Sequence, residues 1–404
     1  MVKLKKELGL FQVTLAGIGI ILGAGIYALI GVASGIAGNA IWISFLIGTV
    51  IAMLTGLSYA ELSSIFKKDA GEYEYVEHSL NKKLAFWLGL VIVFAGIVTA
   101  STVSLGFATY FAALFQTPMI LTALAVVVIT SLVNYYGIKE SSWFNTVCTL
   151  IESLGLILVI ILGFKFIGKI DYFEMPNGFS GVLQATALIF FAFLGFDNII
   201  KLAEETKDPQ KTIPKAVMLS IIFSSIIYIL VSVVSVSVLG WETLSASSAP
   251  LADVAKATVP SLGGIIFFVL AMIALFSTSN TVLMSLVTSS RMTYGMAEEK
   301  GLPKIFAAVD KYRKTPWFSI LLIMIVSLLF VLVGDIEIVA GIANLGLFIT
   351  FAFVNLALII LRYKWPNVKR NFIVPLNIGR FNILAFLGLL FNLFMIYYVF
   401  VGLL

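Results

Sequence analysis

Charged side chains are scarce in this sequence of 404 residues: only 12% of them are Asp, Glu, Lys or Arg, whereas 60% are hydrophobic. Soluble domains carry roughly 25% charged residues. The charged residues of this chain are therefore too few to cover the surface of a protein surrounded by water. Between Glu7 and Glu61, and again from Leu84 to Ile138, no side chain is ionisable except tyrosine. Each stretch is more than twice the roughly 20 residues that one bilayer crossing needs. Each is therefore predicted to contain two membrane spans.

Cysteine and histidine are nearly absent as well. The sequence has one cysteine, Cys148, and one histidine, His78. One cysteine cannot build a disulfide framework, and a single histidine without a Cys/His cluster predicts no metal site. No pairing of a nucleophile with a general base is apparent either. We therefore expect neither an enzyme nor a bound cofactor or metal.

The apolar segments divide into eleven predicted membrane spans. They cover residues 11–37, 40–60, 84–115, 119–137, 141–164, 181–200, 216–240, 261–290, 316–334, 338–361 and 381–404. Turn signals separate neighbouring spans inside the long uncharged stretches, at Gly38-Asn39 and at Gln116-Thr117-Pro118. The fold class predicted from this pattern is an all-α polytopic membrane protein.

The basic residues indicate which side of the membrane each loop occupies. Of the 26 Lys and Arg residues, all except Lys165, Lys169 and Lys256 lie on the N-terminus or on alternate loops and helix ends of the same side. Because cytoplasmic loops carry an excess of Lys and Arg, the N-terminus is predicted to be cytoplasmic and Leu404 extracytoplasmic. Orientation in the lipid bilayer then accounts for the net charge of +5, and no nucleic-acid partner is expected.

Glycine clusters in the first span and interrupts the sixth. Four glycines occur within the nine residues Gly17–Gly25, and each weakens a helix by about 1 kcal/mol relative to alanine. They indicate either a break in the helix or close packing against a neighbouring helix. The sixth span contains Gly195 and Asp197 in the otherwise apolar run Phe190–Asn198.

Broken helices in the first and sixth spans are what two inverted repeats of five helices place opposite each other. Unwound backbone is tolerated at membrane depth only where it faces protein, water or a ligand. At such a break, the N–H groups that start a half-helix suit a carboxylate, and free carbonyls suit an ammonium group. The pattern therefore favours an amino acid as the small-molecule substrate.

Three segments resemble one known transporter family, the amino acid–polyamine–organocation permeases. They are Gly23–Ile26 in the first span, Phe190–Pro214 around the sixth span and Ser290–Pro303 after the eighth span. The resemblance extends in order over nearly the whole chain and implies a leucine-transporter-type fold that works by alternating access. It implies a single transport domain with inverted repeats at residues 8–165 and 180–362 and a peripheral eleventh span at 363–404. The family usually has a twelfth span.

The resemblance also implies a substrate site between the two breaks. Its residues are Ile21, Gly23, Ala24, Gly25, Phe191, Phe193 and Gly195. The Ile21 carbonyl is expected to hold the amino group of the substrate, and the Ala24 and Gly25 amides its carboxylate. Phe191 is expected to close over the substrate. One departure from the family lies in the loop after the second span, where Glu72 replaces the second glycine of a common pair.

Two acidic residues in predicted spans are candidates for proton coupling. Glu152 lies in the middle of the fifth span, where an isolated charge costs about 2.5–3.5 kcal/mol on insertion scales. It is expected either to gain and lose a proton or to serve as a protonated structural group. Asp197 is expected to relay a proton, to cap the following half-helix, or both. The hydroxyls of Ser277, Thr278 and Ser279 are a weaker alternative for sodium coupling, because such hydroxyls often bond to their own helix.

These features predict a proton-coupled importer of neutral amino acids in the cell membrane. The predicted pocket wall at the sixth-span break is aromatic. Once Glu152 and Asp197 take coupling roles, no acidic residue remains there to pair with a cationic substrate. The alternative within transport is an exchanger or a polyamine carrier, in which one of these acids pairs with a substrate cation. A nutrient sensor that does not transport is less favoured, because such sensors usually carry long soluble tails. The sequence gives no indication of the oligomeric state.

Overall fold

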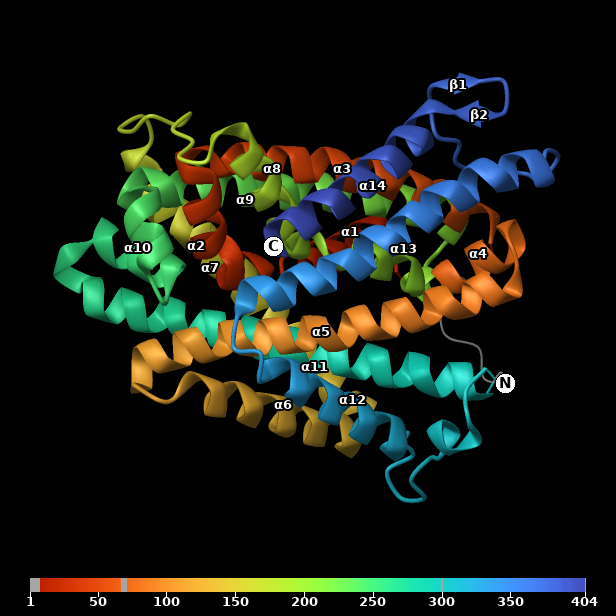
Figure 1. Ribbon diagram of the computed structural model, residues 1–404, viewed down its shortest axis with the longest axis horizontal. Coiled ribbons are helices and arrows are strands. Elements are labelled where there is room, and N and C mark those ends of the chain that lie inside the picture. The colour runs from red at the N-terminus through yellow and green to blue at the C-terminus, as the bar shows by residue number, and fades with distance from the viewer. Residues whose placement is uncertain (1–7, 67–70, 299–300, 404) are drawn as a thin grey trace.

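The chain folds into helices that run side by side, with a two-stranded hairpin at one end (Figure 1). This computed structural model describes residues 8–66, 71–298 and 301–403, and the side chains of these residues except 138–146, 201 and 203–205. The α-helices are α1 (Leu10–Ile21), α2 (Gly25–Ala37), α3 (Ile41–Ile65), α4 (Glu72–Ser79), α5 (Lys82–Phe115), α6 (Met119–Tyr136), α7 (Ile138–Gly163), α8 (Gly178–Ile189), α9 (Pro209–Ala246), α10 (Pro250–Thr258), α11 (Gly263–Glu298), α12 (Trp317–Val331), α13 (Ile336–Lys364) and α14 (Ile383–Leu403).

Short elements connect or interrupt these helices. The 3₁₀-helices are η1 (Gly38–Ala40), η2 (Phe164–Phe166), η3 (Phe190–Phe193), η4 (Phe196–Glu205), η5 (Pro260–Leu262) and η6 (Lys304–Ala307). The strands β1 (Asn377–Ile378) and β2 (Phe381–Asn382) pair in antiparallel register, with Asn377 opposite Asn382.

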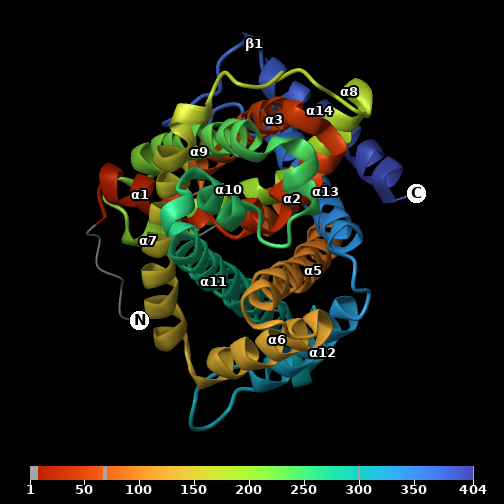
Figure 2. The same cartoon turned by 90° about the vertical axis from the view of Figure 1, so that its left-hand side faces the viewer.

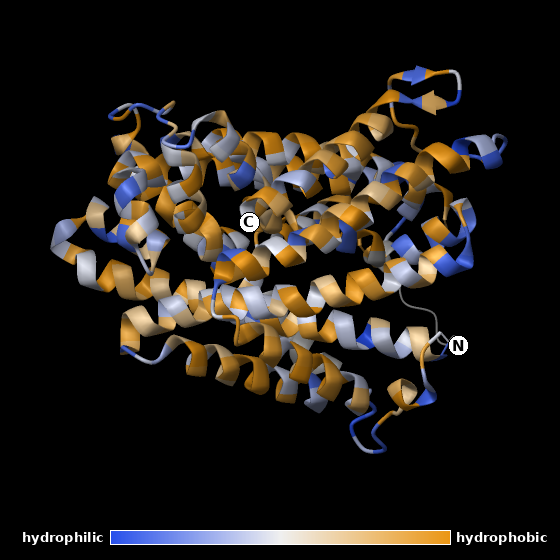
Figure 3. Ribbon diagram, viewed as in Figure 1, coloured by the Kyte–Doolittle hydropathy of each residue, from blue (hydrophilic) through white to orange (hydrophobic). Residues whose placement is uncertain are grey.

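The helices have the lengths and composition of membrane spans. Nine helical segments in the described part of the chain are long and apolar enough to cross a membrane. One of them, Gly25–Ile65, contains two helices, α2 and α3, joined by η1, and the apolar helices α1 and α12 are shorter. Hydrophilic residues gather mainly at the two ends of the bundle (Figure 3). The prediction of an all-α polytopic membrane protein is confirmed, whereas the division into inverted repeats stays a prediction.

The helices pack in two groups. Helices α1, α2, α3, α8 and α9 contact one another on one side of the molecule, and α5, α6, α11 and α12 do so on the other (Figure 2). Helix α7 packs against α9 and α11, and α13 packs against α5 and α14. Because α1, α2 and α8 belong to one group, the predicted breaks of the first and sixth spans lie close to each other.

The two ends of the bundle differ in character. The described N-terminal residues, α4, η6 and the hairpin β1–β2 lie at one end, which is on the right of Figure 1. Helix α10 and the loop before α8 lie at the opposite end (Figure 1). The loops that the sequence assigns to the cytoplasm are therefore on one side of the fold. Which side of a membrane that end faces stays a prediction.

One buried carboxylate ties several elements together at the end where the hairpin lies. Glu61, near the end of α3, is 0% exposed. Arg362 of α13 donates to both oxygens of this carboxylate, from Nε to Oε1 at 2.9 Å and from a terminal nitrogen to Oε2. Arg370 pairs with it at 3.1 Å, and the Val374 N–H donates to it at 2.8 Å. The carboxylate therefore fixes the segment before β1 against the ends of α3 and α13.

Candidate functional site

The first membrane span is broken where the sequence predicts. Helix α1 ends at Ile21 and α2 begins at Gly25, with non-helical backbone between them. Within the break, the Gly23 N–H donates to the Ile21 carbonyl at 2.7 Å. Ile21, Leu22 and Ala24 are buried. The break thus lies in the interior of the bundle, with Gly23 half-buried.

The four glycines of this span have two different roles. A Cβ atom at Gly17 would lie 2.3 Å from the Ser220 Oγ on α9, and one at Gly19 would lie 2.0 Å from a methyl carbon of Thr149 on α7. These two glycines allow close packing between helices. Gly23 and Gly25 instead belong to the break itself. Both interpretations of the glycine cluster are therefore correct, and Gly25, at the start of α2, has both roles because it also lies close to Ala192.

The start of α2 presents unpaired backbone donors. Within the described part of the chain, the N–H groups of Gly25, Ile26 and Tyr27 have no hydrogen-bond acceptor. The Ala24 N–H donates to the Thr281 Oγ1 of α11 at 3.3 Å. The first N–H groups of a helix lack an intrahelical partner and carry the positive end of its dipole. Unpaired N–H groups at a helix start favour an anion such as a carboxylate.

The sixth span is interrupted in the same region. Helix α8 gives way to the 3₁₀-helices η3 and η4, which are separated by Leu194 and Gly195. Gly195 has a φ of +112°, a conformation that favours glycine. A Cβ atom on it would lie 2.8 Å from the Ile20 carbonyl oxygen, and one on Gly25 would lie 2.5 Å from the Ala192 Cα. The two broken segments thus touch through glycines, as the sequence predicts for breaks that face each other.

A tyrosine that the sequence analysis did not single out joins the two breaks. The Tyr228 hydroxyl on α9 lies 2.5 Å from the Ile21 carbonyl oxygen and 2.7 Å from that of Ala192, and donates toward both. It has a single hydrogen for these two acceptors. The Ile21 carbonyl, expected to hold the substrate's amino group, therefore shares its donor with the other break. The feature of the sequence that could have indicated this role is a tyrosine in the middle of an apolar span.

An asparagine has a similar role at the end of α8. The Asn344 side chain of α13 donates to the carbonyls of Ala187 and Leu188 at 2.7 and 2.8 Å. The last carbonyls of a helix have no intrahelical partner, so Asn344 satisfies groups that the break sets free. Like Tyr228, it is a polar residue inside an apolar span, which is a signal that can be read from a sequence.

The aromatic residues predicted for the substrate site are buried beside the sixth-span break. Phe191 and Phe193 are both in η3, at 2% and 0% exposure. The Phe193 ring centroid lies 5.5 Å from that of Tyr228 and 6.5 Å from that of Phe45. Phe193 therefore helps to hold Tyr228 in position. Phe191 precedes Ala192, the residue that contacts Gly25.

Glu152 lies next to the first span. It is 1% exposed, and within the described part of the chain its Oε2 has no hydrogen-bond partner and its carboxyl forms no ion pair. The Tyr27 hydroxyl of α2 donates to its backbone carbonyl at 2.9 Å. The Ser277 hydroxyl of α11 lies near the carboxyl, but within the described residues the Ser277 Oγ has no hydrogen-bond partner. The structure thus brings Glu152 and Ser277 together beside the first-span break.

Comparison with known proteins identifies both a family and individual relatives of this chain. The family model described as "Amino acid permease" matches residues 8–403. The chain belongs to the amino acid permease family. It is a transporter, not an enzyme, as the sequence predicts.

Several proteins similar to this permease have names that state what they transport. It is 29% identical to the branched-chain amino acid permease BcaP of Bacillus subtilis, over 97% of this chain and 88% of that protein. It is 31% identical to the methylthioribose transporter of the same organism, over 92% and 84%. It is 29% identical to cationic amino acid transporter 4 of Mus musculus, over 89% of this chain but only 60% of the relative.

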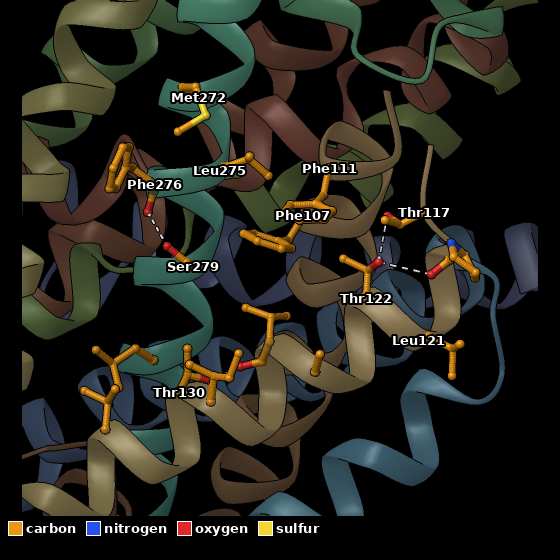
Figure 4. Close-up of a pocket in the computed structure, with 16 residues that line it drawn as sticks. Phe107, Phe111, Thr117, Leu121, Thr122, Thr130, Met272, Leu275, Phe276 and Ser279 are labelled. Atoms are coloured by element: carbon orange, nitrogen blue, oxygen red, sulfur yellow. Dashed lines mark hydrogen bonds between the residues drawn. The ribbon is translucent and has the colours of Figure 1, made fainter. Parts of the chain in front are cut away.

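The three hydroxyl residues considered for sodium point in different directions in this permease. Ser277 faces α7, as described above. The Thr278 Oγ1 donates to the Ala274 carbonyl at 2.7 Å, and the Ser279 Oγ donates to the Phe276 carbonyl at 3.0 Å. Ser279 lines an apolar groove of about 1110 Å³ between α5, α6 and α11 (Figure 4). The structure therefore does not bring these three hydroxyls to one point.

Asp197 and Glu72 lie on the side of the sixth-span break that faces α4. The Asp197 carboxylate accepts a hydrogen bond from the Gly195 N–H at 3.2 Å, inside the break. The Tyr59 ring of α3 packs against that of Phe196, the residue before Asp197, with centroids 5.7 Å apart, and its hydroxyl donates to the Glu72 carboxylate at 2.8 Å. Glu72, the departure from the family's glycine pair, is only 6% exposed. A phenol thus stands between a carboxylate at the break and one on α4.

Proposed function

We propose that this permease imports neutral amino acids by alternating access between the two sides of the cell membrane. The observation that supports this is the pairing of opposite partial charges at the breaks. Three unpaired N–H groups begin α2 at Gly25, and the Ile21 and Ala192 carbonyls, which share the Tyr228 hydroxyl, belong to the same two breaks. A zwitterionic amino acid offers a carboxylate to the first and an ammonium group to the second.

An uncharged substrate side chain fits the residues around the sixth-span break. Phe191, Ala192 and Phe193 are buried and apolar. The nearest acid there, Asp197, already accepts the Gly195 N–H. A cationic side chain would need a carboxylate to offset its loss of hydration. The relative BcaP is named as a permease for branched-chain amino acids, which have side chains of this kind.

Proton coupling is assigned to Glu152. Its carboxyl is buried beside the first span and forms no ion pair within the described residues. A carboxyl at this depth is far less costly when neutral than when charged, so it can release its proton only when water reaches it. Because the Tyr27 hydroxyl joins α7 to α2 here, movement of the first span changes the surroundings of Glu152. Asp197 is the second candidate for this role.

The proposal is tested by uptake into liposomes that contain the purified protein. The panel consists of labelled neutral and cationic amino acids, a polyamine and methylthioribose, each with and without an imposed pH gradient. Accumulation of a neutral amino acid only with the gradient supports the proposal. Transport only in exchange for internal substrate, or preference for a cation, would establish the exchanger or polyamine carrier instead. Transport of methylthioribose alone would show that the substrate is not an amino acid.

A further inference from the structure

A second cavity lies at the end of the bundle where α4 is found, away from the helix breaks. Its volume is about 420 Å³, and it is bordered by α4, the first turns of α5 and the end of α11. The residues that line it are Tyr73, Lys82, Lys83, Phe86, Trp87, Met296 and Gly301. Two lysines and several large apolar side chains thus surround one space.

The positive charge in this cavity has no acidic partner among the described residues. Lys82 and Lys83 are exposed and form no ion pair there. They occupy the first turn of the 34-residue helix α5, and their backbone N–H groups have no acceptor in the described part of the chain. The Asn81 side chain caps this turn by accepting the Leu84 N–H at 2.9 Å. Two ammonium groups and a helix N-terminus therefore favour an anion at the same place.

The rest of the cavity is suited to hydrocarbon. Trp87, which lines the cavity, is 64% exposed, and Leu84, beside it on α5, is 36% exposed; both follow the lysines within two turns. Phe86 forms part of the wall and packs so closely on Gly301 that a Cβ there would lie 2.9 Å from its ring. Tryptophan is enriched where a membrane meets water, because its ring is amphipathic. Charge at the helix start and apolar rings beyond it describe a ligand with an anionic head and an apolar tail.

We infer that this cavity binds an anionic phospholipid. Its phosphate lies between Lys82 and Lys83 at the start of α5, and its acyl chains lie along Trp87 and Leu84. The charge complementarity matches the anionic lipids of a cytoplasmic leaflet, which attract basic residues near the membrane surface. The sequence assigns this end of the permease to that side. The inference does not depend on the identity of the transported substrate.

The test is native mass spectrometry of the full-length protein in detergent, titrated separately with phosphatidylglycerol, phosphatidylcholine and inorganic phosphate. We expect tighter binding of phosphatidylglycerol than of phosphatidylcholine. The double variant Lys82→Gln/Lys83→Gln should weaken phosphatidylglycerol binding by about thirtyfold, since each lysine near a membrane surface contributes roughly a fivefold factor. The matched control is Lys165→Gln/Lys169→Gln, which removes the same charge at the opposite end and should leave the affinity unchanged.

Three outcomes would overturn the inference. The first is a Lys82/Lys83 double variant that binds phosphatidylglycerol as the unmodified protein does. The second is inorganic phosphate that binds as tightly as the lipid, which would make free phosphate the ligand. If the double variant does not fold, the unmodified protein still decides the matter. Its affinity for phosphatidylglycerol must then fall as ionic strength rises. An affinity that does not depend on salt is the third outcome that would overturn the inference.

Discussion

Replacing Tyr228 with phenylalanine removes the one hydroxyl that joins the two broken helices. The hydroxyl donates toward the Ile21 and Ala192 carbonyls at 2.5 and 2.7 Å. The ring stays, so its packing against Phe45 and Phe193 at 5.6 and 5.5 Å is kept. The Ile21 carbonyl keeps the Gly23 N–H as a donor at 2.7 Å, but the Ala192 carbonyl loses the Tyr228 hydroxyl, and leaving a buried polar group unsatisfied costs about 1–3 kcal/mol.

The substitution therefore destabilises, by that free energy, the conformation in which the two breaks contact each other. Since 1.36 kcal/mol corresponds to a factor of ten, kcat/KM for uptake into liposomes should fall by about 5- to 150-fold. Thermal unfolding in detergent should show that the Tyr228→Phe variant still folds. The control is Tyr110→Phe, which removes a weaker bond of 3.3 Å to the Tyr27 carbonyl and should have a smaller effect. Unchanged uptake by the Tyr228 variant, with normal expression, would refute the idea that this hydroxyl couples the breaks.

Four further predictions follow from the structure. Gly25→Ala places a methyl group 2.5 Å from the Ala192 Cα, so both uptake and the yield of folded protein should fall; normal values for both would show that the breaks do not touch there. Glu152→Gln should abolish accumulation driven by a pH gradient but preserve exchange, whereas Asp197→Asn, measured in the same uptake assay, should accumulate substrate if Asp197 has only a structural role. Glu61→Gln breaks the buried ion pairs with the arginines and should lower the free energy of unfolding by about 3–5 kcal/mol, visible in thermal denaturation; an unchanged melting temperature would contradict it. A reporter fused to the C-terminus should be extracytoplasmic and one in the loop between the sixth and seventh spans cytoplasmic, and the reverse result would reject the assigned orientation.

The helices and their breaks could be predicted because their signals are local. Runs of apolar residues set the spans, and the glycines at positions 23, 25 and 195 mark the breaks. Glycine alone does not say whether it loosens a helix or lets another approach. That is why Gly17 and Gly19, which contact α9 and α7, could not be separated from Gly23 and Gly25 in advance.

The polar contacts that hold the site together could not be predicted in the same way. The Tyr228 bond to Ile21 spans 207 residues, and the Ala24 bond to Thr281 spans 257. The Arg362 pair with Glu61 spans 301 residues. Such pairs depend on how distant helices are placed against one another, which residue spacing does not contain. The separate directions of Ser277, Thr278 and Ser279 likewise depend on which neighbour covers each face of α11.

The proposed function requires that the helix breaks hold both charged ends of an amino acid. The most direct measurement is inhibition of uptake in liposomes by three compounds that share one neutral side chain: the free amino acid, its carboxamide and its N-acetyl derivative. In the proposed function, the unpaired N–H groups at the start of α2 bind the carboxylate, and the carbonyls of Ile21 and Ala192, which now accept the Tyr228 hydroxyl, accept from the ammonium group. We therefore expect the free amino acid to inhibit and both derivatives to fail. Inhibition by the carboxamide or the N-acetyl derivative at the level of the free amino acid would contradict the account.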